Sequence, residues 1–357
     1  MTAEHVPKVS IVFPVRNELA NYRVCLESLY RQSFLDFEAL WVEGGSSDDT
    51  TARVRREFPQ VTVIDTGGDL GFRRKCRLGA ASARGDYVLL VNADVEFEPD
   101  WLERLVRVLD THPDVGVVAP LILLYDRRDL VNEAGNTFHF SGVYGSRGLD
   151  RPRDGYRGLL DIGIPSGCCF MIRRALWQQL GGFSEDFDAY DTGFHSAAED
   201  QDLCWRVRLA GHRILLESDA VMYHKYVRKP FVAAKLNTTF FSLWLVLLRN
   251  FRWRTLLALS PFALLMFGLL FSAGVVHGSK SVAMLTRTQA WVIGHIGDIM
   301  RMRRRVQAHR AVSDLAIVRV MEHHLNVTSI VALQGAFSAL CAAYYQLFRA
   351  LVFVVRS

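Results

Sequence analysis

Hydrophobic positions in the first third of the chain fall alternately into short continuous runs and helix-spaced sets. Five apolar runs have the length of buried strands: Val9–Val15, 37–42, 61–65, 87–91 and 116–119. Four segments between them carry apolar residues at helical spacing: 21–33, 51–58, 73–84 and 100–110. Repeated strand–helix units of this kind predict an α/β fold with a mostly parallel sheet.

Polar clusters follow three of the predicted strands, at residues 14–18, 43–50 and 92–94. In parallel sheets, ligands bind beyond the carboxyl ends of the strands. The topology alone therefore predicts a ligand site built from these three clusters.

Composition excludes several protein classes. The chain has 357 residues, of which 50% are hydrophobic and 22% are charged, and no low-complexity tract, so it is not largely disordered. Six cysteines without a CxxC pair exclude a disulfide framework and a zinc ribbon, and are typical of reduced thiols in the cytosol. Because Met1–Lys8 is polar and the first apolar run is short, we expect no signal peptide and a cytosolic start.

The net charge of +5 conceals two opposed parts. Residues 226–357 contain 16 Lys and Arg but only three acids, a net +13, and residues 1–225 carry a net −8. A basic, apolar tail suits the surface of an anionic membrane. Nucleic acid is the rival partner for basic charge, but the arginines alternate with long aliphatic runs, so we expect no nucleic-acid binding.

Four local patterns carry candidate chemistry, and each also has a purely structural interpretation. The turn over 43–50 offers glycines and N-cap residues, but lacks both the GxGxxG and the GK[ST] phosphate-binding spacings. Asp94 follows a buried strand, where a carboxylate could hold a divalent cation or only face solvent.

The other two patterns lie further along the chain. Acids at Glu199, Asp200 and Asp202 open a predicted helix, where like charges should raise at least one pKa and suit a general base. His224 ends a predicted strand. It is a candidate metal ligand only if it lies close to Asp94.

The order of these segments resembles the inverting family-2 glycosyltransferases with the GT-A fold, particularly the rhamnosyltransferase-type members. The resemblance covers about residues 8–226. The matching segments are 9–18, 43–50, 85–94, 166–174, 181–185, 199–206 and His224.

This resemblance implies a role for each matching residue. Asp200, flanked by Glu199, would be the catalytic base, and Asp94 and His224 would bind Mg²⁺ or Mn²⁺. The acceptor side would include Gly167, Glu185 and Trp205, although Trp205 could instead pack its helix. The residues expected at the nucleotide-sugar donor are Pro14, Arg16, Glu18, Glu43, Ser46, Asp48, Arg73, Arg77, Asn92 and Ala93.

The sequence also departs from the family pattern. Glu43 replaces the usual Asp, Gly44 replaces Asp or Asn, and Asn92 replaces the first acid of the DxD-type motif. The resemblance therefore implies a UDP- or dTDP-linked donor without choosing between them. A saccharide or lipid-linked glycan would be the acceptor, in the assembly of cell-surface polysaccharide. The basic residues Arg73, Arg74, Lys75 and Arg77 could contact phosphate or form a solvated helix face.

The tail predicts a membrane-associated helical region. We expect a catalytic domain over 1–226 and a helical region over 227–357, with candidate membrane helices at 255–279 and 325–348. If both helices crossed the bilayer, the arginines at 301–305 would lie outside, against the positive-inside rule, so interfacial and re-entrant arrangements stay open. We expect the catalytic domain on the cytoplasmic side of the cell membrane. Pairing of the tail helices between subunits is a further alternative.

Three other functions fit the sequence less well. A processive synthase would carry a Gln-x-x-Arg-Trp motif, but residues 249–253 have the Arg-Trp without the Gln, so we interpret them as an interfacial anchor. A catalytically inactive, sugar-nucleotide-binding membrane scaffold is disfavoured by the intact Asp94, Asp200 and His224. The missing GxGxxG disfavours an oxidoreductase. The long insertion over 125–165 suggests a lid near the acceptor, with disorder as the alternative.

Overall fold

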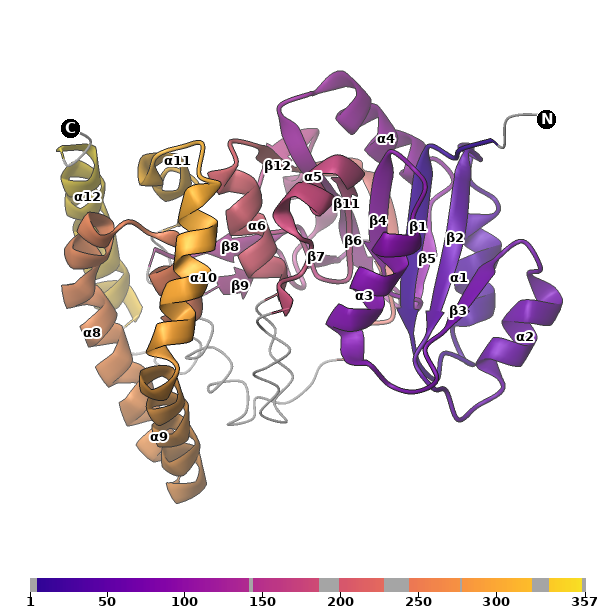
Figure 1. Cartoon of the computed structure of the whole chain (residues 1–357). Helices are drawn as coiled ribbons and strands as arrows, with labels where there is room; N and C mark the ends of the chain where they lie inside the picture. Colours follow the sequence, from indigo (N-terminus) through magenta and orange to yellow (C-terminus); the bar gives the residue numbers. More distant parts are fainter. Residues whose placement is uncertain are drawn as a thin grey trace. The chain divides into compact units, whose positions relative to one another are not determined.

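The computed structural model describes residues 5–140, 144–185, 199–227, 244–276, 278–322 and 334–354. It divides into two compact units. The sheet unit comprises residues 1–136, 146–184 and 212–227, and the helical unit comprises residues 137–145, 185–211 and 228–357. Figure 1 shows the elements of both units, and each is described by itself below.

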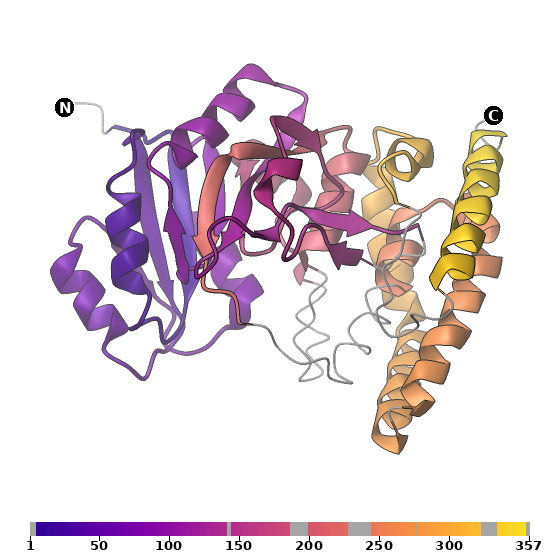
Figure 2. The same ribbon diagram turned by 180° about the vertical axis from the view of Figure 1, so that it is seen from behind.

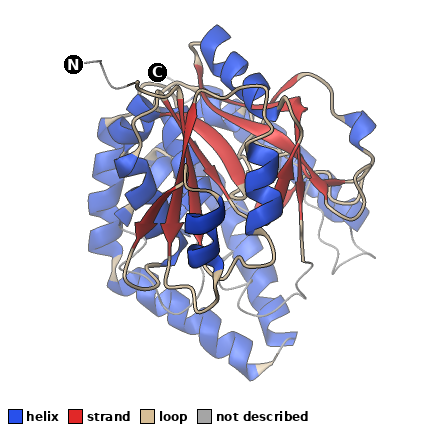
Figure 3. Cartoon of the chain, turned by 90° about the vertical axis from the view of Figure 1, so that its right-hand side faces the viewer, coloured by secondary structure: helices blue, strands red, loops and turns tan. Residues whose placement is uncertain are grey.

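The sheet unit is built on one mixed β-sheet (Figures 1 and 3). Its strands are β1 (Val9–Val15), β2 (Phe37–Glu43), β3 (Thr62–Asp65), β4 (Tyr87–Val91), β5 (Val95–Phe97), β6 (Val115–Leu124), β7 (Val131–Glu133), β10 (Leu159–Asp161), β11 (Cys169–Arg173) and β12 (Arg213–His224). Their order is β10-β12-β6-β11-β4-β1-β2-β3, with β5 beside β12 and β7 beside β6. The block β4-β1-β2-β3 is parallel, and β12 is parallel to β6, whereas β11 runs antiparallel to both of its neighbours.

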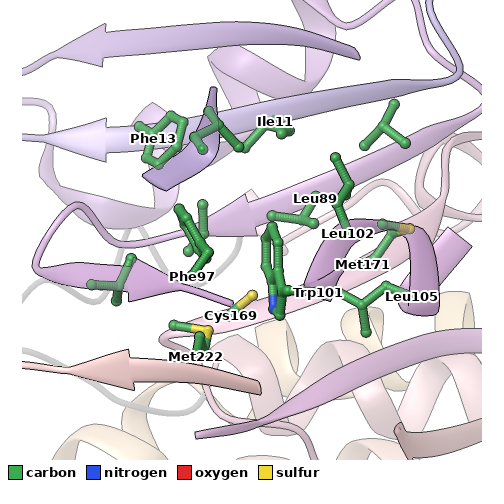
Figure 4. Packing of buried hydrophobic residues seen from close by; sticks show 14 of the residues in the cluster. Ile11, Phe13, Leu89, Phe97, Trp101, Leu102, Leu105, Cys169, Met171 and Met222 are labelled. Atoms are coloured by element: carbon green, nitrogen blue, oxygen red, sulfur yellow. The ribbon is translucent and has the colours of Figure 1, made fainter. Parts of the chain in front are cut away.

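Helices cover both faces of the parallel block. The helices of this unit are α1 (Tyr22–Leu29), α2 (Thr50–Glu57), α3 (Gly71–Ser82), α4 (Trp101–Thr111) and α5 (Arg174–Leu180). Successive strand residues face opposite sides. Ile11 and Phe13 join one core with residues of α1, α2 and α4, whereas Val12 faces Gly79 of α3 on the other side. Figure 4 shows how Trp101 and Leu105 of α4 pack among Leu89, Phe97 and Met222.

The apolar runs predict this part of the fold closely. β1 and β4 match the predicted bounds, because both faces of these strands are buried and their sequences are continuously apolar. The helix expected over 21–33 ends earlier, at Leu29, and the strand expected over 116–119 extends through Val115–Leu124. Figure 2 gives the rear view of the long strand β12, whose last residue is His224, as expected.

The insertion over 125–165 contains four short strands among its described residues, so the disorder interpretation is wrong for these strands. β7 and β10 extend the main sheet, and β8 (Asn136–Phe138) pairs with β9 (Tyr144–Ser146) in a separate two-stranded ribbon. These pairings join segments far apart in the sequence, such as Leu160 with Leu216.

The helical unit contains six helices whose two ends both lie among its described residues. They are α6 (Glu199–Leu209), α8 (Trp253–Val276), α9 (Ser279–Gly294), α10 (Ile296–Ala308), α11 (Asp314–Val318) and α12 (Gln334–Val354), and residues 244–250 are also helical. α12 packs on α8, where the Tyr344 hydroxyl donates to the Ala258 carbonyl at 2.6 Å.

The candidate membrane helices coincide only in part with these elements. The segment 255–279 corresponds to α8, and 325–348 overlaps α12 but begins outside the described residues. None of the helices in the described part of the chain is long and apolar enough to span a bilayer. The expectation of a spanning helix is therefore unsupported there.

The predicted interfacial anchor at 249–253 is wrong for its first three residues. Arg249, Asn250 and Phe251 are at most 2% exposed, whereas Trp253 is 55% exposed. Arg249 is buried because its guanidinium lies 2.9 Å from the Asp202 carboxylate, a partner 47 residues away in the sequence.

Candidate functional site

The loops that follow β1 and β2 are joined to each other by hydrogen bonds. Val15 pairs with Glu43 at the end of the strands, so both loops leave the same edge of the sheet. Asn17 has a positive φ of 58°, which directs its N–H to the Ser46 hydroxyl at 2.8 Å. The Asn17 side chain in return accepts from the Ser47 N–H at 2.8 Å. These contacts build the edge predicted to hold the donor.

The carboxylates of the 43–50 turn face into the turn. Glu43 is 4% exposed and accepts from the Ser46 N–H at 2.6 Å and from the Thr51 hydroxyl. Asp48 accepts from the Leu19 N–H at 3.3 Å and from Thr50. Glu43, Ser46 and Asp48 therefore shape this edge by holding its backbone.

Lys75 of α3 reaches the same edge and is buried, so the solvated-face interpretation is wrong for this residue. It is 5% exposed, its Nζ donates to the Val15 carbonyl at 3.0 Å, and it lies 3.7 Å from Asp69. Asp69 also pairs with Arg16 at 2.6 Å. A Cβ on Gly44 would lie 2.6 Å from Lys75 Nζ, so the departure from the family pattern at position 44 makes room for this lysine.

The sequence does contain a signal that Lys75 is buried. It lies at helical spacing from Gly79, which packs against β1 and β2, so both belong to the buried face of α3. Of the predicted arginines on this helix, Arg77 donates to the Phe183 carbonyl at 3.4 Å, and Arg73 is half-buried in the first turn.

Asp94 and His224 meet at the end of β4 and β12, which is the condition on which the metal prediction depended. Asp94 Oδ2 lies 3.3 Å from His224 Nε2, and the Lys225 N–H donates to the Asp94 carbonyl at 2.9 Å. His224 Nδ1 lies 2.8 Å from the amide oxygen of Asn132. Because an amide oxygen only accepts, Nδ1 is the donor, and Nε2 is the nitrogen directed at Asp94.

The pair has the properties of a cation site. Asp94 Oδ1 is buried and has no hydrogen-bond partner among the described residues. Burial acts to lower the pKa of His224, but the net pKa shift is upward because Cys168 and Asp94 favour the charged ring. The pKa of Glu18 is raised by its burial and also by the charges of Asp94 and Asp48. A cation at Asp94 would relieve this excess of negative charge.

The donor set fits a metal that is shared with a ligand. No cluster of three or more His, Cys, Asp and Glu side chains occurs within the described ranges, so Asp94 and His224 would supply two ligands. Mg²⁺ and related hard cations are often held by one or two carboxylates together with phosphate oxygens and water. Asn92 and Ala93 set the position of Asp94, since the Asn92 N–H donates to the Cys168 carbonyl at 2.9 Å and Ala93 is buried.

The predicted base lies on α6, in the helical unit. Burial raises the pKa of Asp200 to about 6, against the lowering effect of the Gln201 N–H that its carboxylate accepts at 2.7 Å. A raised pKa was expected from the neighbouring acids, and its largest cause is burial. Glu199 begins the same helix and is half-buried.

The acceptor-side prediction fails for Trp205, which is 2% exposed. Its ring packs edge-on against Phe138 at 4.6 Å and Phe251 at 4.9 Å, so it anchors α6. Gly167 lies between β10 and β11 and is half-buried. Glu185 is exposed and is the last described residue before 199.

Comparison with known proteins decides the family. Residues 10–181 match the family model described as Glycosyl transferase family 2. Residues 10–181 therefore form a family 2 glycosyltransferase domain. Protein y4gI of Sinorhizobium fredii is 30% identical to this protein over 62% of the chain, a match that covers 25% of that relative. The chain thus spans about a quarter of that protein.

Two further relatives have descriptive names. An N-acetylglucosaminyl-diphospho-decaprenol L-rhamnosyltransferase of Mycobacterium tuberculosis is 26% identical, over 62% of this chain and 76% of the relative. The O-antigen biosynthesis protein RfbC of Myxococcus xanthus is 25% identical, over 61% of this chain and 17% of the relative. The resemblance to rhamnosyltransferase-type members is confirmed.

Solved structures support a GT-A-like fold for this chain. GalNAc-T7 with UDP, GalNAc and Mn²⁺ superposes with a TM-score of 0.53 at 15% identity, covering 68% of this chain and 48% of that one. The mannosyltransferase PcManGT of Pyrobaculum calidifontis, with GDP-Man and Mn²⁺, gives 0.50 at 18% identity, covering 85% and 86%. At these identities the likeness concerns the fold alone.

Proposed function

We propose that this glycosyltransferase moves a sugar from a nucleoside-diphosphate sugar to a hydroxyl of a saccharide or lipid-linked glycan. The reaction would contribute to the assembly of cell-surface polysaccharide. The observation that carries the proposal is the Asp94–His224 pair, 3.3 Å apart at the end of β4, with a buried Asp94 oxygen that has no described partner. Two relatives with related names, a rhamnosyltransferase and an O-antigen biosynthesis protein, support the substrate class.

The donor diphosphate would lie at the carboxyl ends of β1, β2 and β4. Asp94 and His224 would hold Mg²⁺ or Mn²⁺ there, and the metal would offset negative charge on the departing nucleoside diphosphate. Asn132 keeps His224 oriented through Nδ1. Lys75 adds a buried positive charge to the same edge.

The acceptor hydroxyl would lose its proton to Asp200. Burial raises the pKa of this carboxyl to about 6, close to the pH at which a general base works best. The acceptor oxygen attacks the anomeric carbon as the bond from that carbon to the diphosphate oxygen breaks. Attack from the opposite face inverts the anomeric configuration. Glu199 would accompany Asp200 at the start of α6.

The helical unit would attach the enzyme to the cytoplasmic surface of an anionic membrane. Trp253, Leu257 and Leu264 are 55–72% exposed and lie along one side of α8. Leu340 and Leu347 of α12 are also exposed. The sequences of α8, α9 and α12 contain no acid, so the only formal charges in these helices are positive. Apolar faces with basic charge suit an interface of anionic lipids.

Donor binding is the direct test of this function. We expect Mn²⁺ with one of the UDP-, dTDP- or GDP-sugars to protect the purified protein against thermal unfolding, and each nucleotide sugar alone to protect less. Asp94→Asn should lose the Mn²⁺-dependent part of the protection. Equal protection of the wild type and Asp94→Asn would contradict the metal assignment, and no protection by any donor would contradict the function.

A further inference from the structure

A buried cluster of three charged side chains lies under the start of α6. Asp202 is fully buried, and Arg206 and Arg249 are 7% and 2% exposed. Arg206 Nε donates to Asp202 Oδ2 at 2.8 Å, and the other carboxylate oxygen, Oδ1, lies 2.9 Å from Nη1 of Arg249. We call these three residues the Asp202 cluster.

Arg249 does not belong to α6, and its backbone is held from α10. The helix over 244–250 ends at this point, where its last carbonyls need donors. Gln307 donates to the carbonyls of Arg249 and Asn250 at 3.0 and 2.8 Å, and Arg303 donates to those of Leu248 and Phe251. The arginine that meets Asp202 is therefore fixed by side chains from a segment about 55 residues further along the chain.

The cost of this arrangement suggests that it serves more than folding. A buried ion pair rarely stabilises a protein more than well-packed apolar residues would, whereas removing one partner is strongly destabilising. Trp205 already packs α6 against Phe138 and Phe251. Beyond this packing, the Asp202 cluster fixes the rotation of the first turn of α6 about the helix axis and its position along that axis.

That first turn carries the proposed base. Asp200 and Asp202 are two residues apart, and an α-helix turns by about 100° per residue, so their side chains leave the axis on roughly opposite sides. The side chain of Asp202 points into the buried cluster, while Asp200 keeps partial exposure. Holding Asp202 in place thus aims Asp200.

We infer that Arg249 is a positioning residue for the catalytic base, acting through Asp202. This inference rests on the proposed function, in which Asp200 is that base. It assigns the region after residue 227 a part in catalysis besides attachment to the membrane. From sequence, residues 249–253 were interpreted as an interfacial anchor. In this inference they instead link the side chains of α10 to the position of the catalytic base.

The test compares steady-state kinetics of Arg249→Gln, Arg249→Lys and a matched control, Arg252→Gln. Arg252 is exposed and lies three residues away, so its substitution removes the same charge without touching Asp202. We expect Arg249→Gln to lower kcat about 10- to 100-fold, the range for a misplaced catalytic group. The KM for the donor should stay unchanged, because the donor residues belong to the sheet unit. Arg249→Lys should recover part of kcat, and Arg252→Gln should match the wild type.

A thermal-unfolding measurement separates positioning from folding. Arg249→Gln leaves Asp202 paired with Arg206 at 2.7 Å, so the variant should stay folded at the assay temperature. Positioning predicts that kcat falls in a protein that is still folded and still binds its donor. A wild-type kcat in the folded Arg249→Gln variant would overturn the inference.

Asp200→Asn distinguishes failure of this inference from failure of the proposed function. If Asp200→Asn abolishes turnover while Arg249→Gln keeps the wild-type kcat, only the role of Arg249 is refuted. If Asp200→Asn keeps wild-type turnover, the assignment of the base fails, and the positioning role fails with it.

Discussion

Gly44→Ala should destabilise the protein through Lys75. The new Cβ would lie 2.6 Å from Lys75 Nζ, 2.9 Å from its Cδ and 3.0 Å from the Val15 carbonyl oxygen. Lys75 is 5% exposed, so it has little room to move without losing its 3.0 Å hydrogen bond to that carbonyl. Hydrogen bonds to charged groups contribute about 1.5–3 kcal/mol, so we expect a loss of about 2 kcal/mol. For a domain of this size, that lowers Tm by about 4–8 °C.

Thermal unfolding of a small set of variants checks this reasoning. Gly68→Ala is the matched control, since nothing lies within 4 Å of a Cβ there, and it should leave Tm within about 1 °C of the wild type. In a Lys75→Ala background the clash partner is gone, so Gly44→Ala should cost much less. An equal cost in both backgrounds, or a Gly44→Ala protein as stable as the wild type, would refute the proposed contact.

Three further predictions concern the metal pair, the base and the exposed face of α8. Asn132→Ala removes the hydrogen-bond partner of His224 Nδ1 and should weaken Mn²⁺ binding about 10- to 100-fold in a metal titration; unchanged affinity would contradict the orientation of the ring. Because burial raises the pKa of Asp200 to about 6, kcat/KM should fall about tenfold per pH unit below that value, as the carboxylate is protonated, and a profile flat down to pH 4 would exclude this base. Leu257→Glu with Leu264→Glu should reduce co-sedimentation with anionic vesicles while the protein stays monomeric; unchanged sedimentation, or a dimer in the wild type that these substitutions dissociate, would favour pairing between copies.

The parallel part of the fold was predictable from sequence, because its strands are buried on both faces. Val9–Val15 and Tyr87–Val91 are continuous apolar runs, and nothing in tertiary structure overrides such a signal. β11 and β10 were missed because their antiparallel pairings depend on partners 50 or more residues away in the chain. Short strands with distant partners have no local periodicity to reveal them.

The candidate site likewise has features that could be predicted from sequence and features that depend on distant contacts. The meeting of Asp94 and His224 follows from the order of strand ends, so it could be anticipated from topology. The burial of Arg249 could not, because an arginine beside aromatic residues is typical of an interface, and its partner Asp202 lies 47 residues earlier. A raised pKa of Asp200 was anticipated from the neighbouring acids, but its largest cause is burial, which depends on packing that local sequence does not encode.

We propose that this protein transfers a sugar from a nucleotide donor with Asp200 as the base. The most direct measurement is the release of nucleoside diphosphate from a panel of UDP-, dTDP- and GDP-sugars, in the presence of Mn²⁺ and a saccharide or lipid-linked acceptor, by the wild type and by Asp200→Asn. We expect acceptor-dependent release by the wild type with one class of donor, and loss of that release in Asp200→Asn with donor binding retained. Release by Asp200→Asn at the wild-type rate, or no release by the wild type from any donor, would contradict this proposal.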